Sequence, residues 1–232
     1  MTARKFWKGA VRWYDRIISF VLVLVLLIVI YCMYDNLWVY NHTIDKSILK
    51  YKPGTENYDP QQSPISNDMV AWITIDNTNI DYPVMQAKDN VKYLNTDPYG
   101  KYTLSGSIFL DSRNSSDFSD DYSLVYGHHM EYGKMFGALD DFLDEKYLKK
   151  HSTGTLIIGR EGKTSCKLKI FAALKVNANE TAVFDIAVGG VKEYLTKAIK
   201  ASPEQSKRIL ALSTCSEDST PQRIVVFCYI ND

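Results

Sequence analysis

An uninterrupted apolar run near the start of the chain limits its fold more strongly than any other feature. Residues 17–34 carry no charged side chain, and most of them are Leu, Ile or Val. As a helix rising about 1.5 Å per residue, this run spans about 27 Å, close to the roughly 30 Å hydrocarbon core of a bilayer. Residues 1–16 carry five basic side chains against one acidic side chain. Basic flanks stay on the cytoplasmic side, so the remainder of the chain is expected outside the cell.

A cleaved signal peptide is the competing interpretation of this run. The apolar region of a signal peptide usually has about 7 to 15 residues and ends near an Ala-x-Ala-like site. The run in this chain is longer and no such site follows it, which favours an uncleaved single-pass anchor. The predicted organisation is a cytoplasmic basic segment at 1–16, a transmembrane anchor at 17–34, a juxtamembrane helix and linker at 35–66, and one extracellular domain at 67–232.

The part of the chain beyond the anchor has the size of one domain. It contains roughly 180 residues, enough for one sizeable core and too few for two ordinary domains. The whole chain has 27 basic and 27 acidic residues, so its charge gives no sign of nucleic-acid binding. Three cysteines lie in this outer part, where disulfides are allowed, and the odd number leaves at least one thiol outside any intrachain pair. We expect Cys228 in the core and Cys166 in a turn.

Short segments rich in β-branched and aromatic residues alternate with turn residues over the outer domain, which is typical of a mainly β fold. The predicted strands are 71–75, 80–86, 107–110, 123–126, 155–158, 167–176, 208–214 and 223–230. Helical spacing of apolar residues predicts short helices at 91–95, 134–142 and 188–200. Eight short strands separated by turns suggest a closed or nearly closed barrel with a few helices.

Two of these predicted strands bring chemically useful side chains to facing ends. Cys215 follows the strand 208–214, and Arg223 begins the next strand. A thiol and a guanidinium so placed can address one carbonyl, the sulfur as nucleophile and the cation as donor to its oxygen. His128, just after another strand, offers a base. Its neighbour His129 points the opposite way on a strand and is expected in solvent or in a supporting contact.

These pieces, in this order, resemble the sortases, the membrane-anchored cysteine transpeptidases of Gram-positive bacteria, and the match is closest to class B. The resemblance runs from about Asn67 to Tyr229. It is carried by Trp72-Ile-Thr-Ile75, Ile80-Asp-Tyr-Pro-Val84, Tyr93-Leu94-Asn95, Gly106-Ser-Ile-Phe-Leu-Asp-Ser-Arg-Asn114, Tyr126-Gly-His128 and Leu212-Ser-Thr-Cys215. It implies an eight-stranded sortase-type β-barrel with a few helices, preceded by one transmembrane helix.

The resemblance also implies roles for individual residues. Cys215 is the nucleophile, His128 the general acid and base, and Arg223 the group that stabilises the oxyanion. The substrate groove is implied at Asn90, Leu94, Tyr194, Ser213 and Thr214. No metal and no cofactor is implied.

The implied reaction is cleavage of a C-terminal sorting motif in secreted proteins through a thioacyl-enzyme. The acyl group then passes to an amine of a peptidoglycan precursor, or to a pilin. Two alternatives remain from the residues alone. An extracellular cysteine protease shares the same groups but hydrolyses its thioester. A non-enzymatic, membrane-tethered metal or haem module would use His128, His129 and Cys215, although the chain has no Cys-x-x-Cys or His-x-x-x-His spacing.

Overall fold

The structure of the chain is a computed structural model that describes residues 3–42, 46–56, 58–215 and 221–231. Its contacts divide it into two compact units, Met1–Asp45 and Lys46–Asp232. The first unit is a single helix, α1 (Ala3–His42). Within α1, Ala10–Tyr34 is long and apolar enough to cross a membrane, with a mean hydropathy of 3.0, and its large apolar side chains are exposed. Lipid is the environment that would cover such side chains.

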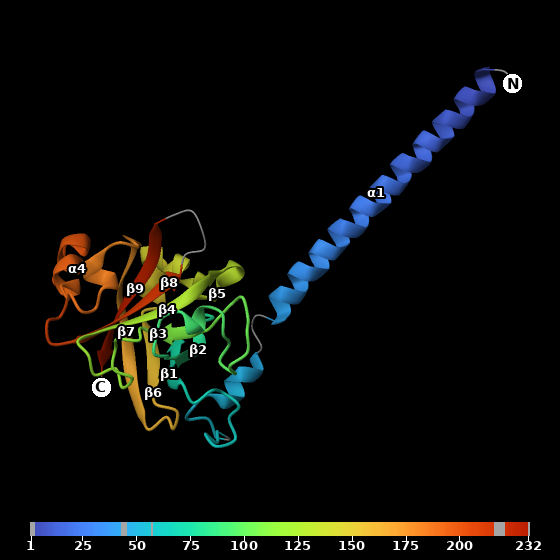
Figure 1. Ribbon diagram of the computed structural model, residues 1–232. Helices are drawn as coiled ribbons and strands as arrows, with labels where there is room; N and C mark the ends of the chain where they lie inside the picture. Colours follow the sequence, from blue (N-terminus) through green and yellow to red (C-terminus); the bar gives the residue numbers. More distant parts are fainter. Residues whose placement is uncertain (1–2, 43–45, 57, 216–220, 232) are drawn as a thin grey trace. The chain divides into compact units, whose positions relative to one another are not determined.

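The second unit is built on a closed β-barrel (Figure 1). Eight strands form the ring in the order β3-β2-β1-β6-β7-β9-β8-β4, and a pairing between β3 and β4 closes it. A ninth strand, β5, pairs with β4 beside the ring. The strands are β1 (Met69–Ile75), β2 (Asp81–Met85), β3 (Ile108–Leu110), β4 (Tyr122–Met130), β5 (Lys134–Met135), β6 (Thr153–Ile158), β7 (Thr164–Asn177), β8 (Arg208–Cys215) and β9 (Gln222–Asn231). The predicted eight-stranded barrel is confirmed.

Alternation along the strands divides their side chains between the interior of the barrel and its outer face. Leu210 and Leu212 of β8 point into the interior, where they join Val125 of β4 and Val226 of β9 in the main core. Phe136 and other residues of the 3₁₀ helix η4 (Phe136–Leu143) pack into this same core. From the interior of the barrel, η4 contacts β4, β8 and β9. It therefore supports the strands that carry the predicted catalytic residues.

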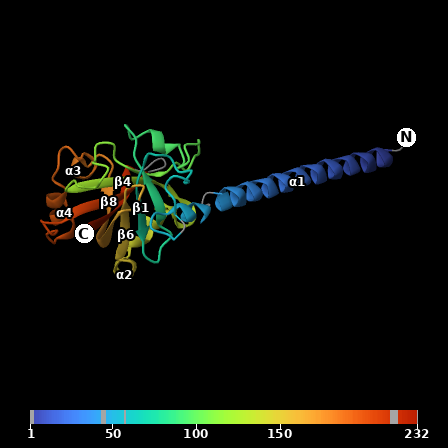
Figure 2. The ribbon, with the colours of Figure 1, turned by 90° about the horizontal axis from the view of Figure 1, so that it is seen from below.

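The outer face of β4, β8 and β9 carries a second apolar layer. Leu124, Ala211 and Phe227 of these strands pack with Val183 and Leu195. Val183 belongs to α3 (Thr181–Phe184) and Leu195 to α4 (Val191–Ile199), and both helices lie beside β4 and β8 in Figure 2. The long connection between β7 and β8 therefore folds back as a wall over one face of the barrel.

A third apolar cluster holds two further short helices against the barrel. Trp72, Tyr93 and Phe109 form its centre. Ile48 of the 3₁₀ helix η1 (Lys46–Tyr51) packs on it, and the 3₁₀ helix η2 (Lys92–Leu94) supplies Tyr93. The other short helices are η3 (Glu131–Gly133) and α2 (Glu145–Lys150).

Two local predictions differ from the structure. The segment 134–142 begins as β5 and continues as a 3₁₀ helix, because Lys134 and Met135 pair with the end of β4. Cys166 lies within β7 opposite Leu156 and is buried, so its prediction as a turn residue was wrong. The polar neighbours that suggested a turn point outward from this strand.

The segment between the anchor and β1 has more structure than a linker. The guanidinium of Arg160, in the turn between β6 and β7, donates to the backbone carbonyls of Pro60, Ser63, Ile65 and Ser66. A planar cation with five N–H donors suits such a set of carbonyls. Residues 58–66 are therefore bound to the barrel as part of the second unit.

Candidate active site

Three neighbouring strands bring His128, Cys215 and Arg223 to one level of the barrel. His128 of β4 is the register partner of Cys215 of β8. Ser213 of β8 pairs with Val225 of β9, and two further steps of this antiparallel register bring Arg223 level with Cys215. Side chains of register partners project from the same face of a sheet. Because these three residues are the ones predicted to be catalytic, we call them the catalytic row.

The catalytic row lies on the outer face of the barrel, the face walled by α3 and α4. The residues two positions earlier on β4 and β8, Tyr126 and Ser213, are also register partners. Tyr126 packs against the outer apolar layer, and period-two alternation gives His128 the same orientation. The structure describes Cys215 by its backbone only.

A backbone carbonyl sets the tautomer of His128. Its Nε2 lies 2.7 Å from the carbonyl oxygen of Leu94. Because a carbonyl oxygen only accepts, Nε2 carries the proton and Nδ1 has the lone pair when the ring is neutral. Among the described residues, Nδ1 has no hydrogen-bond partner, and it is buried. Nδ1 is therefore the ring atom available for proton transfer.

Arg223 also has a buried nitrogen without a hydrogen-bond partner among the described residues. It is half-buried at the start of β9, where Val176 of β7 is its register partner. One guanidinium nitrogen, Nη1, is buried and has no hydrogen-bond partner among the described residues. A buried donor without a partner costs free energy. An anionic oxygen arriving at the catalytic row would satisfy it.

His129 faces away from the catalytic row. Its register partner is Met135 of β5, and its Nε2 lies 2.9 Å from Oδ2 of Asp140 on η4. Both side chains of this pair are exposed by about two fifths or more. This location agrees with the solvent or supporting contact expected for His129.

Ser213 and Thr214 lie on opposite faces of β8. Ser213 is on the face of Cys215 and is fully buried, and its hydroxyl donates to the carbonyl of Thr214 at 3.1 Å. Thr214 faces the interior, where its Oγ1 accepts the backbone N–H of Ile224 at 3.1 Å. Thr214 therefore ties β8 to β9 beside the catalytic row.

Asn90 and Leu94 belong to the segment before β3. Asn90 donates from Nδ2 to Oδ2 of Asp111 at 3.0 Å and accepts the N–H of Ser112 at 2.7 Å. The Leu94 carbonyl holds His128, and its half-buried side chain packs on the third apolar cluster. Both residues thus have supporting contacts in addition to the groove role implied by the sequence.

Tyr194 of α4 is half-buried against the outer apolar layer. Burial raises the pKa of its phenol, and the nearby negative charge of Glu180 raises it further. The hydroxyl therefore stays protonated at neutral pH and is able to donate a hydrogen bond.

Gly106 supports the site, and the sequence did not single it out. Its φ is +57°, and a Cβ there would stand 2.4 Å from the carbonyl oxygens of both Leu94 and Tyr93. The Leu94 carbonyl can reach His128 only because this position has no side chain. The glycine at the head of the Gly106–Asn114 motif was the available signal.

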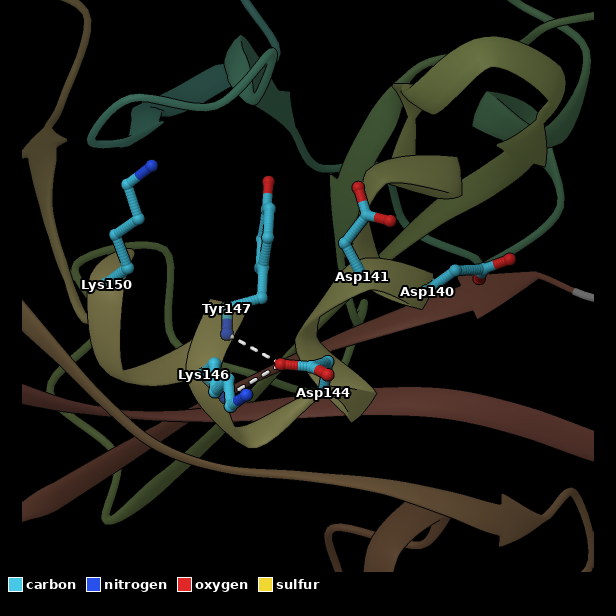
Figure 3. A pocket seen from close by; sticks show the side chains of 6 residues that line it. All are labelled: Asp140, Asp141, Asp144, Lys146, Tyr147 and Lys150. Atoms are coloured by element: carbon cyan, nitrogen blue, oxygen red, sulfur yellow. Dashed lines mark hydrogen bonds between the residues drawn. The ribbon is translucent and has the colours of Figure 1, made fainter.

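An acidic pocket of about 500 Å³ lies on η4 and α2 (Figure 3). Its lining residues are Asp140, Asp141, Asp144, Lys146, Tyr147 and Lys150. Asp144 accepts the backbone N–H groups of Lys146 and Tyr147 and so caps α2. Within the described residues, no group of three or more His, Cys, Asp or Glu side chains is arranged to hold a metal ion.

Comparison with known proteins gives one consistent result. The sortase domain family model matches residues 73–231. Sortase B of Listeria monocytogenes is 34% identical over 163 residues, which cover 66% of this chain and 65% of that protein. Sortase B of Staphylococcus aureus is 32% identical over 178 residues, covering 72% of this chain and 71% of the relative.

Solved structures agree with the sequence relatives. A Streptococcus pyogenes class B sortase involved in pilus biogenesis has a TM-score of 0.61 and 34% identity, over 71% of this chain and 92% of that chain. A substrate complex of Staphylococcus aureus sortase B has a TM-score of 0.66 and 26% identity, over 85% of this chain and 98% of that chain.

Proposed function

Because the chain belongs to the sortase family, in its class B branch, we propose that it is a membrane-anchored cysteine transpeptidase. It cleaves a C-terminal sorting motif of secreted proteins and transfers the new acyl end to an amine. The amine belongs to a peptidoglycan precursor or to a pilin, and the relative involved in pilus biogenesis makes the second acceptor worth testing.

The observation that carries this proposal is the state of His128 beside Cys215. The two residues are register partners on β4 and β8, and the Leu94 carbonyl leaves Nδ1 as the exchangeable ring position. A base held by one nitrogen and open at the other is the arrangement that activates a thiol. A histidine serving only the fold would normally satisfy both nitrogens.

In the first half of the reaction, the Cys215 thiolate adds to the carbonyl carbon of the scissile peptide bond. A C–S bond forms and the carbonyl oxygen becomes anionic. When this intermediate collapses, the C–N bond breaks and the proton on His128 Nδ1 passes to the leaving amine. The product is a thioester between Cys215 and the substrate's acyl group.

In the second half, neutral His128 accepts a proton at Nδ1 from the incoming amine. The amine nitrogen attacks the thioester, a new amide bond forms and the Cys215 sulfur leaves. The imidazolium and thiolate are then restored for the next cycle. The Leu94 carbonyl stabilises the ring in both protonation states because Nε2 stays a donor throughout.

Arg223 stabilises the oxyanion of both tetrahedral intermediates. A guanidinium stays charged at any physiological pH and does not give up its proton to the oxyanion. The buried Nη1 supports this role, since an oxyanion would supply the acceptor that the described residues do not.

The groove that receives the sorting motif is assigned to the outer face beside α4. Tyr194 and Ser213 are proposed to line it near the catalytic row, and Leu94 and Asn90 to form the opposite edge. Thr214 is proposed to act indirectly, by fixing β8 against β9 through Ile224.

The anchor assigns the reaction to the cell surface. We propose that residues 17–34 span the membrane once, with residues 1–16 in the cytoplasm and the barrel outside. Protease added to intact cells should remove the barrel and leave the N-terminal segment protected. Degradation only after cell lysis would contradict this orientation.

Product analysis tests the proposed activity. The purified chain in detergent is incubated with peptides of the Asn-Pro-x-Thr-x kind, with and without triglycine. Peptide joined to triglycine supports the transpeptidase. Hydrolysed peptide alone, at every triglycine concentration, supports the protease alternative. Activity that persists in Cys215→Ala would exclude Cys215 as the nucleophile.

A further inference from the structure

A fully buried carboxylate lies one strand away from the catalytic row. Asp111 follows β3 directly, and its side chain is inaccessible to solvent. Oδ1 accepts from the backbone N–H of Arg113 at 3.0 Å and from its Nε at 2.9 Å. Oδ2 accepts from Arg113 Nη2 at 3.0 Å, Asn90 Nδ2 at 3.0 Å and the Tyr126 hydroxyl at 3.1 Å. Five donors saturate the acceptor capacity of this carboxylate.

Arg113 connects this carboxylate to the wall of the proposed groove. Its Nη1 donates to Oδ1 of Asp185 at 2.8 Å, and its Nη2 also donates to the carbonyl of Phe184 at 3.0 Å. Phe184 ends α3 and Asp185 follows it. A guanidinium holds two acceptor groups at once in fixed directions, which an ammonium does not. One side chain thus links the end of α3 to the carboxylate that follows β3.

The two remaining donors to Asp111 belong to the surroundings of His128. Tyr126 precedes His128 by two positions on the same face of β4, and its register partner is Ser213. Asn90 lies on the segment that presents the Leu94 carbonyl to His128. Asp111 therefore contacts both the strand that carries the histidine and the segment that holds its ring.

We propose that Asp111 and Arg113 are positioning residues for the transpeptidation: Asp111 holds the Leu94 segment and β4 in register for His128, and Arg113 sets the distance of α3 from them. This inference rests on the proposed function, because it assigns the groove and the acid–base role to these elements.

Charge at the pair agrees with this role. Burial alone raises the pKa of Asp111, but the hydrogen bonds and charge of Arg113 outweigh that effect and lower it overall. The same pairing raises the pKa of Arg113. The pair stays ionised over the neutral range, so its hydrogen bonds do not change with moderate changes of pH.

Three variants of the full chain in detergent, compared with two control variants, separate the two roles. Asp185→Ala removes the carboxylate acceptor at the end of α3. Arg113→Lys keeps a positive charge but replaces the guanidinium, which has several N–H donors in fixed directions, with a single ammonium group. Asp185→Ala should raise KM for the sorting peptide at least threefold with kcat within twofold of the parent. Arg113→Lys should raise KM to a similar extent and also lower kcat, because it removes two hydrogen bonds to Asp111. Asp111→Asn sets an amide donor against the Asn90 amide, and kcat should fall at least tenfold. The matched control for this variant is Asp120→Asn.

Asp120 is a suitable control because it is a carboxylate of the same loop that accepts from Asn114 and Ser115. The control for the wall is Glu193→Ala, which removes an exposed ion pair with Lys197 on α4. Both controls should keep kcat and KM within twofold. Equal kinetic effects in Asp111→Asn and Asp120→Asn would overturn the inference.

Hydrogen exchange gives a readout that does not depend on activity. Asp185→Ala and Arg113→Lys should speed exchange of backbone amides in residues 181–186, and Asp111→Asn should speed it in residues 90–95. Unchanged exchange in both segments would refute the proposed roles of Asp111 and Arg113, which we call the tether. If Asp111→Asn does not fold, the double variant Asp111→Asn with Arg113→Gln removes both charges together and serves in its place, with the same expected loss of kcat.

The two proposals fail in different ways. A parent chain without ligation or hydrolysis of any peptide would contradict the proposed function while exchange still reported the tether. An active parent whose Asp111 and Asp185 variants behave like their controls would contradict the tether alone.

Discussion

A single methyl group at Gly106 should uncouple activity from folding. In Gly106→Ala the new Cβ would lie 2.4 Å from the carbonyl oxygen of Leu94. An ordinary contact between carbon and a carbonyl oxygen is about 3.3 Å or longer, so the Leu94 carbonyl has to retreat by about 0.9 Å. That carbonyl accepts from His128 at 2.7 Å, and the same displacement would break or misdirect this hydrogen bond.

The expected cost has two parts. An alanine at a φ of +57° costs about 1–2 kcal/mol of stability, or about 2–4 °C in Tm for each kcal/mol in a protein of this size. Misplacing a catalytic group by about 1 Å costs about 10²-fold in rate. Thermal unfolding and kcat/KM for peptide ligation, measured on the same preparation, separate the two effects.

Gly159→Ala is the matched control for this prediction. Gly159 also has a positive φ, of +77°, but a Cβ there would meet no atom within 4 Å. It should lose only the stability that the positive φ costs and keep its activity within twofold. If Gly106→Ala is as active as Gly159→Ala, the Leu94 carbonyl does not position His128 and the account of the tautomer is wrong.

Three further predictions concern the catalytic row and the other cysteines. Arg223→Lys should lower kcat by about 10²-fold with little change in Tm, because the fixed donor to the oxyanion is lost; an unchanged kcat would make Arg223 structural. His128→Ala should abolish ligation while His129→Ala, which removes only an exposed contact with Asp140, should keep most of it; the reverse order would exchange their roles. Iodoacetamide at pH 8 should label Cys215 in the folded chain. It should not label Cys166 or Cys228, because both side chains are buried and burial raises the pKa of the Cys228 thiol. Labelling is followed by intact mass spectrometry, and early labelling of Cys166 or Cys228 would contradict their burial.

Most of the barrel could be predicted from the sequence because each strand has a recognisable local pattern of residues. Each of the eight ring strands has an apolar, β-branched run bounded by turn residues, and the structure extends several of them by only a few positions. The closing pairing of β3 with β4 is a contact between segments that no local pattern describes. The number of short strands suggested a closed or nearly closed barrel, but it did not indicate which strands pair.

The errors arose where tertiary contacts outweigh local pattern. Cys166 has polar neighbours that suggest a turn, yet the pairing of β7 with β6 and β9 makes it an inward strand position. The apolar spacing of 134–142 fits a helix, but β4 continues far enough to capture Lys134 and Met135.

At the candidate site, the sequence predicted which residues act, but it did not predict the contacts that support them. Motif order pointed to Cys215, His128 and Arg223 without any knowledge of their neighbours. The carbonyl that fixes the tautomer of His128, the glycine that makes room for it and the buried Asp111 are defined by backbone geometry and long-range contacts. Neither backbone geometry nor long-range contacts can be read from the sequence alone.

The most direct test of the account is the mass of the enzyme caught during turnover. The chain is mixed with a sorting-motif peptide, quenched in acid within seconds and measured intact, with digestion to locate the adduct. The proposed mechanism predicts a mass gain equal to the acyl part of the peptide on Cys215, and this gain disappears when triglycine is added before the quench. A chain that ligates peptide without ever carrying this adduct, or that carries it on another residue, would contradict the proposed mechanism.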